Sequence, residues 1–284
     1  MHSKEIDEHL EKYLDTCINN ELKIWLNEKI EKILSEKSSK SFYLTYSLLA
    51  TKIDKTTIVS ISEDGDLDAY LKVQKITCLE LARLALLRTV LKAEKATFAP
   101  HVSKIIQLAD TTEMATFLKY LILLPNPEQF KLVAVDALRT NVATVFDALA
   151  LHNPYPARYF EDKQWNQMFL KAAFMQRPLH LIVDVEERGN AELARIISDY
   201  AHERWAAGRD IDPYFWRPVA PFLNETLLKD MKRLLESTVS KEQQAGALCC
   251  YNSSDEKANQ LLQKYPNLQK EVENNTFNWN TIHN

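Results

Sequence analysis

The chain has 284 residues, of which 46% are hydrophobic and 26% are charged, as in an ordinary globular protein. The net charge is −4 and no run of basic residues occurs, so we expect no nucleic-acid partner. Only four glycines are present, and neither GxGxxG nor GxxxxGK[ST] occurs, so no Rossmann or P-loop nucleotide site is indicated. Scarce glycine also argues against an all-β fold, because tight hairpins depend on it.

Membrane segments and secretion signals are not indicated either. The longest apolar run, residues 117–124, contains Lys119 and is far shorter than the roughly 20 residues that span a bilayer. The N-terminal text MHSKEIDEHLEKYL lacks the apolar core of a secretion signal, so we expect a cytoplasmic protein with no transmembrane segment. Four cysteines show no zinc or CxxC spacing, and we expect Cys249 and Cys250 to be buried apolar residues.

Apolar residues recur at helical spacing from end to end. Residues 3–36 predict an amphipathic helical arm and residues 39–53 a second helix, whereas TTIVSIS at 56–62 is the only strand-like run. From residue 66 onward, helices alternate with short polar breaks. The expected helices lie at about 66–75, 77–93, 98–109, 111–124, 127–139, 142–151, 163–176, 190–207, 212–222, 225–237, 240–251, 254–265 and 267–274.

The polar breaks carry capping residues. Asp110 and Glu113 have capping-box spacing, and the same spacing recurs at Ser240. Asn126, Asn190 and Asp212 are further expected helix starts. Asn126 and Asp212 each precede a proline, Pro127 and Pro213, which is favoured at the first helical position.

Short helices joined by short breaks are typical of stacked helical hairpins. We therefore predict an all-α fold, a degenerate HEAT-like α-solenoid, with a compact orthogonal helical bundle as the alternative. The predicted organisation is a helical N-terminal arm over residues 1–62 and an α-solenoid-like domain over residues 63–284, with the seam in the 54–66 loop.

The stretch 139–217 contains three of the five tryptophans and three of the seven histidines, with many Arg, Asn and Tyr residues. Such a concentration of directional polar groups exceeds what packing alone requires, so we expect the functional surface here. On a helix, Arg188, Glu192, Arg195, Asp199 and His202 would share one face. That face is either a solvated ladder of ion pairs or one wall of a polar cleft, with Asp199 and His202 as acid, base or ligand.

Metal chemistry is poorly supported by the histidines. His202–Glu203 begins like a zincin motif, but position 206 is alanine where the second histidine is required. His152, His180 and His202 could meet across three helices, although isolated histidines more often serve as core or surface residues. We expect no bound metal and no cofactor.

The Asn153–Tyr159 break contains two prolines, which we expect to exclude helix and to stiffen the chain. Tyr155, Arg158 and Tyr159 on this break form either a turn packed by its own aromatics or a surface for a partner or a flat ligand. In the next helix Trp165, Met168 and Phe169 form a core stripe, while Asn166 lies off that stripe.

These segments resemble the EboA family of bacterial proteins. The matching text is DALRTNVATVFDALALHNPYPARYFEDKQWNQMFLKAAF, the 188–194 stretch, and DYAHERWAAGR. The resemblance is strong over 126–222 and fainter over 75–280, and the first 60 residues do not contribute. It implies work beside the other ebo-cluster products, which resemble a membrane prenyltransferase, a sugar-phosphate cyclase and metal-dependent TIM-barrel proteins, in trafficking secondary-metabolite precursors toward the periplasm. It carries over no activity and no catalytic residue.

The leading hypothesis is a non-enzymatic scaffold or adaptor that acts with the ebo-cluster proteins, and the enzyme question stays open. The alternatives are a carrier of a small aromatic or prenylated intermediate, and an unrecognised α-helical enzyme. A scaffold predicts an open charged or aromatic face, a carrier a closed apolar cavity, and an enzyme titratable groups that converge in a cleft. The expected partner- or ligand-binding residues are Arg139, Asn141, His152, Tyr155, Arg158, Tyr159, Asn166, Arg188, Asp199, His202 and Arg204.

Overall fold

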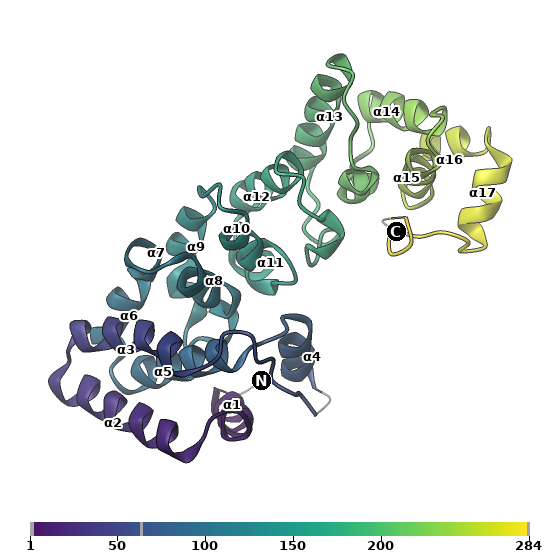
Figure 1. Cartoon of the computed structure of the whole chain (residues 1–284). Helices are drawn as coiled ribbons and strands as arrows, with labels where there is room; N and C mark the ends of the chain where they lie inside the picture. The colour runs from purple at the N-terminus through teal and green to yellow at the C-terminus, as the bar shows by residue number, and fades with distance from the viewer. Residues whose placement is uncertain (1–2, 63–64, 283–284) are drawn as a thin grey trace. The chain divides into compact units, whose positions relative to one another are not determined.

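The computed structural model describes residues 3–62 and 65–282, and they form α-helices joined by short turns (Figure 1). Within those residues the only β pairing is an isolated antiparallel bridge between Ile58 and Thr77, at the run that the sequence marked as strand-like. The predicted all-α class is confirmed, whereas the HEAT-like arrangement of the helices stays a prediction. Across the same residues, no helix is both long and apolar enough to cross a membrane.

The chain divides into two compact units, Met1–Tyr155 and Pro156–Asn284, and each is described by itself. A division after residue 62 stays a prediction. The first unit contains α1 (Ser3–Cys17), α2 (Asn20–Glu36), α3 (Ser39–Lys52), α4 (Asp66–Val73), α5 (Cys78–Ala93), α6 (Lys95–Ser103), α7 (Ile105–Leu108), α8 (Thr111–Lys119), α9 (Lys131–Ala137) and α10 (Ala143–Ala150), with 3₁₀ turns at Leu121–Leu123 and Pro127–Phe130. The short helix α11 (Pro154–Tyr159) begins where this unit ends.

The second unit is also built from α-helices and 3₁₀ segments. It contains α12 (Asp162–Phe174), α13 (Ala191–Ala206), α14 (Glu225–Leu235), α15 (Ser240–Tyr251), α16 (Glu256–Leu262) and α17 (Pro266–Glu273), with 3₁₀ segments η3 (Leu179–Leu181) and η4 (Pro213–Phe222).

Helix α5 is the centre of the first unit, where α1, α2, α3, α6 and α8 all pack on it. Eleven of its sixteen residues are buried, two of them arginines. Its two buried arginines, Arg83 and Arg88, have carboxylate partners: Arg83 meets Glu113 at 3.3 Å, and Arg88 Nε donates to Asp7 at 2.6 Å. The polar side chains inside this core are therefore neutralised locally.

The N-terminal arm is two helices rather than one. Asn19 accepts a hydrogen bond from the Leu22 amide at 2.8 Å and so begins α2, which separates it from α1. The amphipathic arm predicted over residues 3–36 is helical, and the capping Asn19 inside its apolar pattern divides it into α1 and α2.

Most of the expected caps are confirmed. Asp110 forms the predicted capping box with Glu113, Asn190 caps α13, and Asp212 caps the turn at Pro213. Two expectations are wrong. Asn126 lies in the left-handed region without a capping bond, and Ser240 is already the first residue of α15. The segment at 213–222 is 3₁₀ rather than α-helical, since the prolines at 218 and 221 offer no amide N–H.

Helix α15 is the centre of the second unit, packed against α14, η4, α16 and α17. A Cβ built on Gly246 would lie 2.9 Å from the Leu234 Cβ, so the close approach of α14 requires glycine there. Cys249 and Cys250 are buried as expected, and burial raises the pKa of the Cys250 thiol to about 12.

Candidate functional site

Arg188 closes the turn that follows α11. Its guanidinium donates hydrogen bonds to the backbone carbonyls of Pro156 at 3.2 Å, Phe160 at 2.8 Å and also Ala157, and it lies 5.0 Å from the centre of the Trp165 ring. It precedes α13, so it does not share the helical face on which the sequence placed it. The donors of Arg188 serve the protein's own backbone, which is a structural role.

Asn166 and Asn190 form a second internal contact. Their side-chain amides exchange hydrogen bonds at 3.1 and 2.9 Å, and Asn190 at the same time accepts from the Leu193 amide to start α13. Asn166 is buried, which corrects its expected position off the core stripe, because a paired amide can be buried without losing hydrogen bonds. Trp165 is buried as predicted.

Tyr155 is fully buried rather than on a surface, and its hydroxyl donates to the Pro127 carbonyl at 2.8 Å. The segment around it is the helix α11, which corrects the expectation that its prolines exclude helix. Both prolines lie in the first turn, where the amide N–H groups lack helical partners in any case. Arg158 is exposed, with its guanidinium 5.9 Å from the centre of the half-buried Tyr159 ring.

Three other candidates, Arg139, Asn141 and Asp199, lie on exposed surface. Arg139 is exposed and pairs with Asp136 at 3.0 Å, and Asn141 is exposed nearby in the chain. Asp199 pairs with Arg195 on the solvent face of α13, and Arg195 also meets Glu192 at 2.7 Å. The interpretation of that face as a solvated ladder of ion pairs is confirmed for Glu192, Arg195 and Asp199.

His202 contacts a carboxylate that the sequence interpretation missed. Its Nε2 lies 2.6 Å from Asp230 Oδ1, and the Ser198 hydroxyl donates to Asp230 Oδ2 at 2.6 Å. Asp230 is buried on α14, whereas the His202 ring is half exposed. The serine bonds the carboxylate and not the imidazole, so the three groups lack the order of a nucleophilic triad. Asp230 interrupts the apolar stripe of Leu227 and Met231, which is the signal that could have found it.

The segment 207–212, here called the α13 loop, is fixed by its own backbone. Gly208 has φ +64° and its amide donates to the Trp205 carbonyl, while the Arg209 amide reaches the Arg204 carbonyl at 2.9 Å. This is the Schellman pattern of helix termination, which favours glycine at the left-handed position. The Arg204 guanidinium then donates twice to the Asp210 carbonyl, at 3.0 and 2.6 Å.

Two cavities open on the α13 loop, and both are lined by Gly208, Arg209 and Asp210. The large loop cavity has a volume of about 920 Å³ and the small loop cavity about 580 Å³. Together their walls carry seven Lys or Arg side chains and four Asp or Glu side chains, a local surplus of three positive charges in a chain whose net charge is −4. The cations are Arg177, Arg204, Arg209, Lys229, Lys232, Arg233 and Lys241, and the carboxylates are Asp210, Asp212, Glu236 and Glu242.

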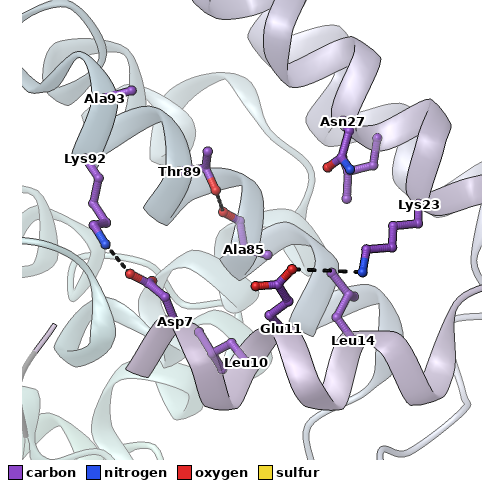
Figure 2. A pocket seen from close by; sticks show the side chains of 11 residues that line it. Asp7, Leu10, Glu11, Leu14, Lys23, Asn27, Ala85, Thr89, Lys92 and Ala93 are labelled. Carbon is purple, nitrogen blue, oxygen red and sulfur yellow. Dashed lines mark hydrogen bonds and ion pairs between the residues drawn. The ribbon is translucent and has the colours of Figure 1, made fainter. Parts of the chain in front are cut away.

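A cavity of about 530 Å³ in the first unit lies among α1, α2 and α5, and Figure 2 shows acidic side chains of α1 reaching lysines on both neighbours. Lys23 pairs with Asp15 at 2.5 Å and with Glu11 at 3.9 Å, and Lys92 pairs with Asp7. Burial alone would raise the pKa of Asp7, but hydrogen bonds from Arg88 and Lys92 lower it overall.

A further cavity of about 540 Å³ in the first unit is lined by His152. The Gln74 side chain donates to the His152 carbonyl at 2.9 Å and holds that turn, in which His152 has φ +53°. Burial lowers the pKa of the imidazole. On the same wall Lys119 pairs with Glu80 at 2.8 Å. The cavity thus combines a neutral imidazole with a satisfied ion pair.

The histidines are not grouped for metal binding. Across the described part of the chain, no group of three or more His, Cys, Asp or Glu side chains is placed to hold a metal ion.

A family model described as metabolite traffic protein EboA matches residues 6–220. The chain belongs to the EboA family. No curated protein and no solved structure matches it.

The EboA match covers the N-terminal helices, so the expectation that the first 60 residues do not contribute is wrong. Their Lys- and Glu-rich text is common among amphipathic helices, yet α1, α2 and α3 supply one side of the α5 core. The match also covers the α13 loop, whereas Lys229 and Arg233 of the small loop cavity lie beyond it.

Proposed function

We propose that this EboA-family chain is a non-enzymatic adaptor in metabolite traffic, and that it acts through the α13 loop. The observation that carries the proposal is the surplus of positive charge around this loop. Arg209, Lys229 and Arg233 have no carboxylate partner among the described residues, although the chain as a whole is net acidic. Arg and Trp side chains at such a surface are the residue types that dominate binding hot spots.

The alternatives fit these cavities less well. Both loop cavities open to solvent and have mixed charged walls, whereas a carrier of apolar cargo calls for a closed apolar cavity. The one cluster of catalytic residue types at the end of α13 is Ser198, Asp230 and His202, and its carboxylate already binds both neighbours. An adaptor needs neither a closed cavity nor a nucleophile.

The adaptor proposal is tested with the proteins encoded beside members of this family, purified one by one. Biolayer interferometry measures whether the immobilised chain binds any of them. Arg209→Glu is expected to weaken that binding by at least about tenfold, since a hot-spot arginine contributes about 2 kcal/mol or more. Lys163→Glu, the same charge change at an exposed residue of α12, is the matched control. Absence of binding to every product, or equal binding by both variants, rejects the proposal.

A second candidate function rests on the His152 cavity. A half-buried imidazole with a lowered pKa, beside Val73, Leu79 and Leu151, suits a neutral or aromatic small molecule. Native mass spectrometry of the purified chain would show a bound mass that disappears in His152→Ala and persists in Arg139→Ala. An unliganded parent after incubation with aromatic precursors would exclude this carrier role.

A further inference from the structure

We infer that the small loop cavity binds the phosphate group of an anionic small molecule, held by Arg209, Lys229 and Arg233. This inference rests on the proposed function, since it names the chemical class of the metabolite that the adaptor would handle. The cavity of about 580 Å³ has the size of a small-molecule site.

The Arg233 guanidinium has no hydrogen-bond or ion-pair partner among the described residues. Its guanidinium carbon lies 4.2 Å from the centre of the Trp205 ring, a cation–π contact. The N–H groups point outward in the guanidinium plane, in the fork that matches phosphate oxygens. Trp205 is itself seated on the fully buried Trp216, with ring centres 5.7 Å apart and planes at 19°. The arginine is therefore pre-positioned by packing and not by an ion pair.

Arg209 and Lys229 supply two more cations from different elements. Arg209 projects from the α13 loop, whose backbone is fixed by the left-handed Gly208 and by the Arg204 side chain. Lys229 lies four residues before Arg233 on α14, so both occupy one face of that helix. Neither Arg209 nor Lys229 has an ion-pair partner among the described residues, so both charges are available to a ligand.

The floor of the cavity adds partial positive charge. Ser237, Thr238 and Val239 line it where α15 begins, and Val239 provides no side-chain cap for the first amide groups of that helix. The amides at the start of this twelve-residue helix attract an anion, and the Glu242 carboxylate in the first turn offsets part of that attraction.

The carboxylates in the wall reduce the positive surplus without removing it. Glu236 accepts from the Tyr265 hydroxyl at 3.3 Å and pairs with Lys232 at 3.7 Å. Glu242 accepts from the Ser237 hydroxyl at 2.5 Å and keeps its negative charge, as does Asp210, which follows Arg209 in the chain. Arg209, Lys229 and Arg233 against Asp210 and Glu242 leave a surplus of one positive charge, which favours an anionic ligand. Among anions, a phosphate ester carries about 1.5 to 2 charges at pH 7 and offers several oxygens to the guanidinium groups of Arg209 and Arg233.

The inference is tested by isothermal titration calorimetry with phenyl phosphate, inorganic diphosphate and phenol. The two phosphates should bind and phenol should not. Arg209→Ala and Arg233→Ala should each weaken binding by at least about tenfold, because each removes charge-assisted hydrogen bonds. Arg233→Lys, which keeps the charge but loses the fork, should lie between Arg233→Ala and the parent. Asp210→Asn should tighten binding by about twofold, and the control Lys163→Ala should leave it unchanged.

Several results overturn the inference. These are no binding of either phosphate, equal binding of phenol, or binding that Arg209→Ala and Arg233→Ala leave unaltered while their thermal unfolding stays cooperative. Binding to phosphatidylglycerol vesicles without binding to phenyl phosphate would assign the site to a lipid headgroup and reject the small-molecule ligand. If Arg209→Glu loses the protein partner while the parent binds no phosphate, the adaptor proposal stands and this inference fails. If the chain binds phosphate but none of the proteins encoded beside the family, this inference stands and the adaptor proposal fails.

Discussion

The cavity among α1, α2 and α5 and the small loop cavity have nearly the same volume, about 530 and 580 Å³, but treat their cations differently. In the first, Lys23 and Lys92 are both paired with carboxylates of α1 (Figure 2). In the second, Arg233 lies against the Trp205 ring, and Arg209 has no acidic partner in the part of the chain that the structure describes. Basic side chains in a cavity therefore indicate a ligand only where the protein has not already neutralised them. The first cavity stabilises the fold, and the second is available for binding.

The largest expected effect tests whether the second unit, despite its open loop, has a tightly packed core. Trp165→Ala should lower the free energy of unfolding by about 3–5 kcal/mol, because it removes a buried indole and leaves a cavity. Urea denaturation followed by circular dichroism measures the change. Trp25→Ala in the first unit, where the indole is only half-buried beneath Lys52, should cost clearly less. Equal losses would show that packing does not distinguish these sites.

The next effect concerns the paired cavity. Asp7→Asn should destabilise by about 3 kcal/mol at pH 7, since it leaves the buried Arg88 without its carboxylate. The folded-state pKa of Asp7 is lowered from 3.8, so its stabilisation is present above that pH and is lost as the pH falls through the folded-state value. The difference in unfolding free energy between the parent and Asp7→Asn should therefore become smaller below pH 3.8. Urea denaturation at a series of pH values measures it. A gap that widens in acid would contradict this assignment, and Glu11→Gln, at a more exposed pair, should cost below about 1 kcal/mol.

A smaller loss is expected where the α13 loop begins. Gly208→Ala should cost about 1 kcal/mol, because an alanine at φ +64° is strained even though no atom lies within 4 Å of the added Cβ. Differential scanning calorimetry gives the shift. Gly208→Asn should cost less, since asparagine tolerates the left-handed region. An alanine variant as stable as the parent would mean that the loop can adopt another conformation.

The smallest expected effect separates the cations of the small loop cavity from the paired cations of the first cavity. Arg209→Ala should change the unfolding free energy by less than about 0.5 kcal/mol, because the exposed guanidinium supports no other side chain. The same calorimeter suffices. A loss above 1 kcal/mol would place Arg209 with Asp7, among residues that hold the fold.

Helix positions could be predicted from the sequence because the apolar period and the caps at Asp110 and Asn190 are local signals. Which polar side chains bind a ligand could not be predicted from the sequence, because the partner of a polar group depends on the tertiary fold. Arg188 and Asn166 have the chemistry of ligand contacts, yet one satisfies the carbonyls of a turn and the other pairs with a capping asparagine. Arg204 was expected to contact a partner or ligand, but its guanidinium binds the Asp210 carbonyl at the end of α13, a contact that depends on the backbone conformation at Gly208.

The cations of the small loop cavity illustrate the limit from the other side. Lys229 and Arg233 belong to an amphipathic helix whose charged face resembles any solvated surface. No local sequence pattern shows that this face lies beside Trp205 and Arg209, which come before α14 in the chain. The aromatic residue beneath the arginine is the feature that separates this face from an ordinary one, and it becomes visible only in three dimensions.

The burial of α5 has a consequence for the motions of the first unit. A helix enclosed by α1, α2, α3, α6 and α8 exposes its amides to water only when several neighbours separate from it together. In hydrogen–deuterium exchange, α5 should therefore keep its protons longest in that unit, and the ends of α1 should lose theirs first. The two enclosed guanidinium groups of Arg83 and Arg88 strengthen this contrast, because partial opening would part them from their carboxylates before water could fully replace those contacts. Opening of α5 should thus be an all-or-none event.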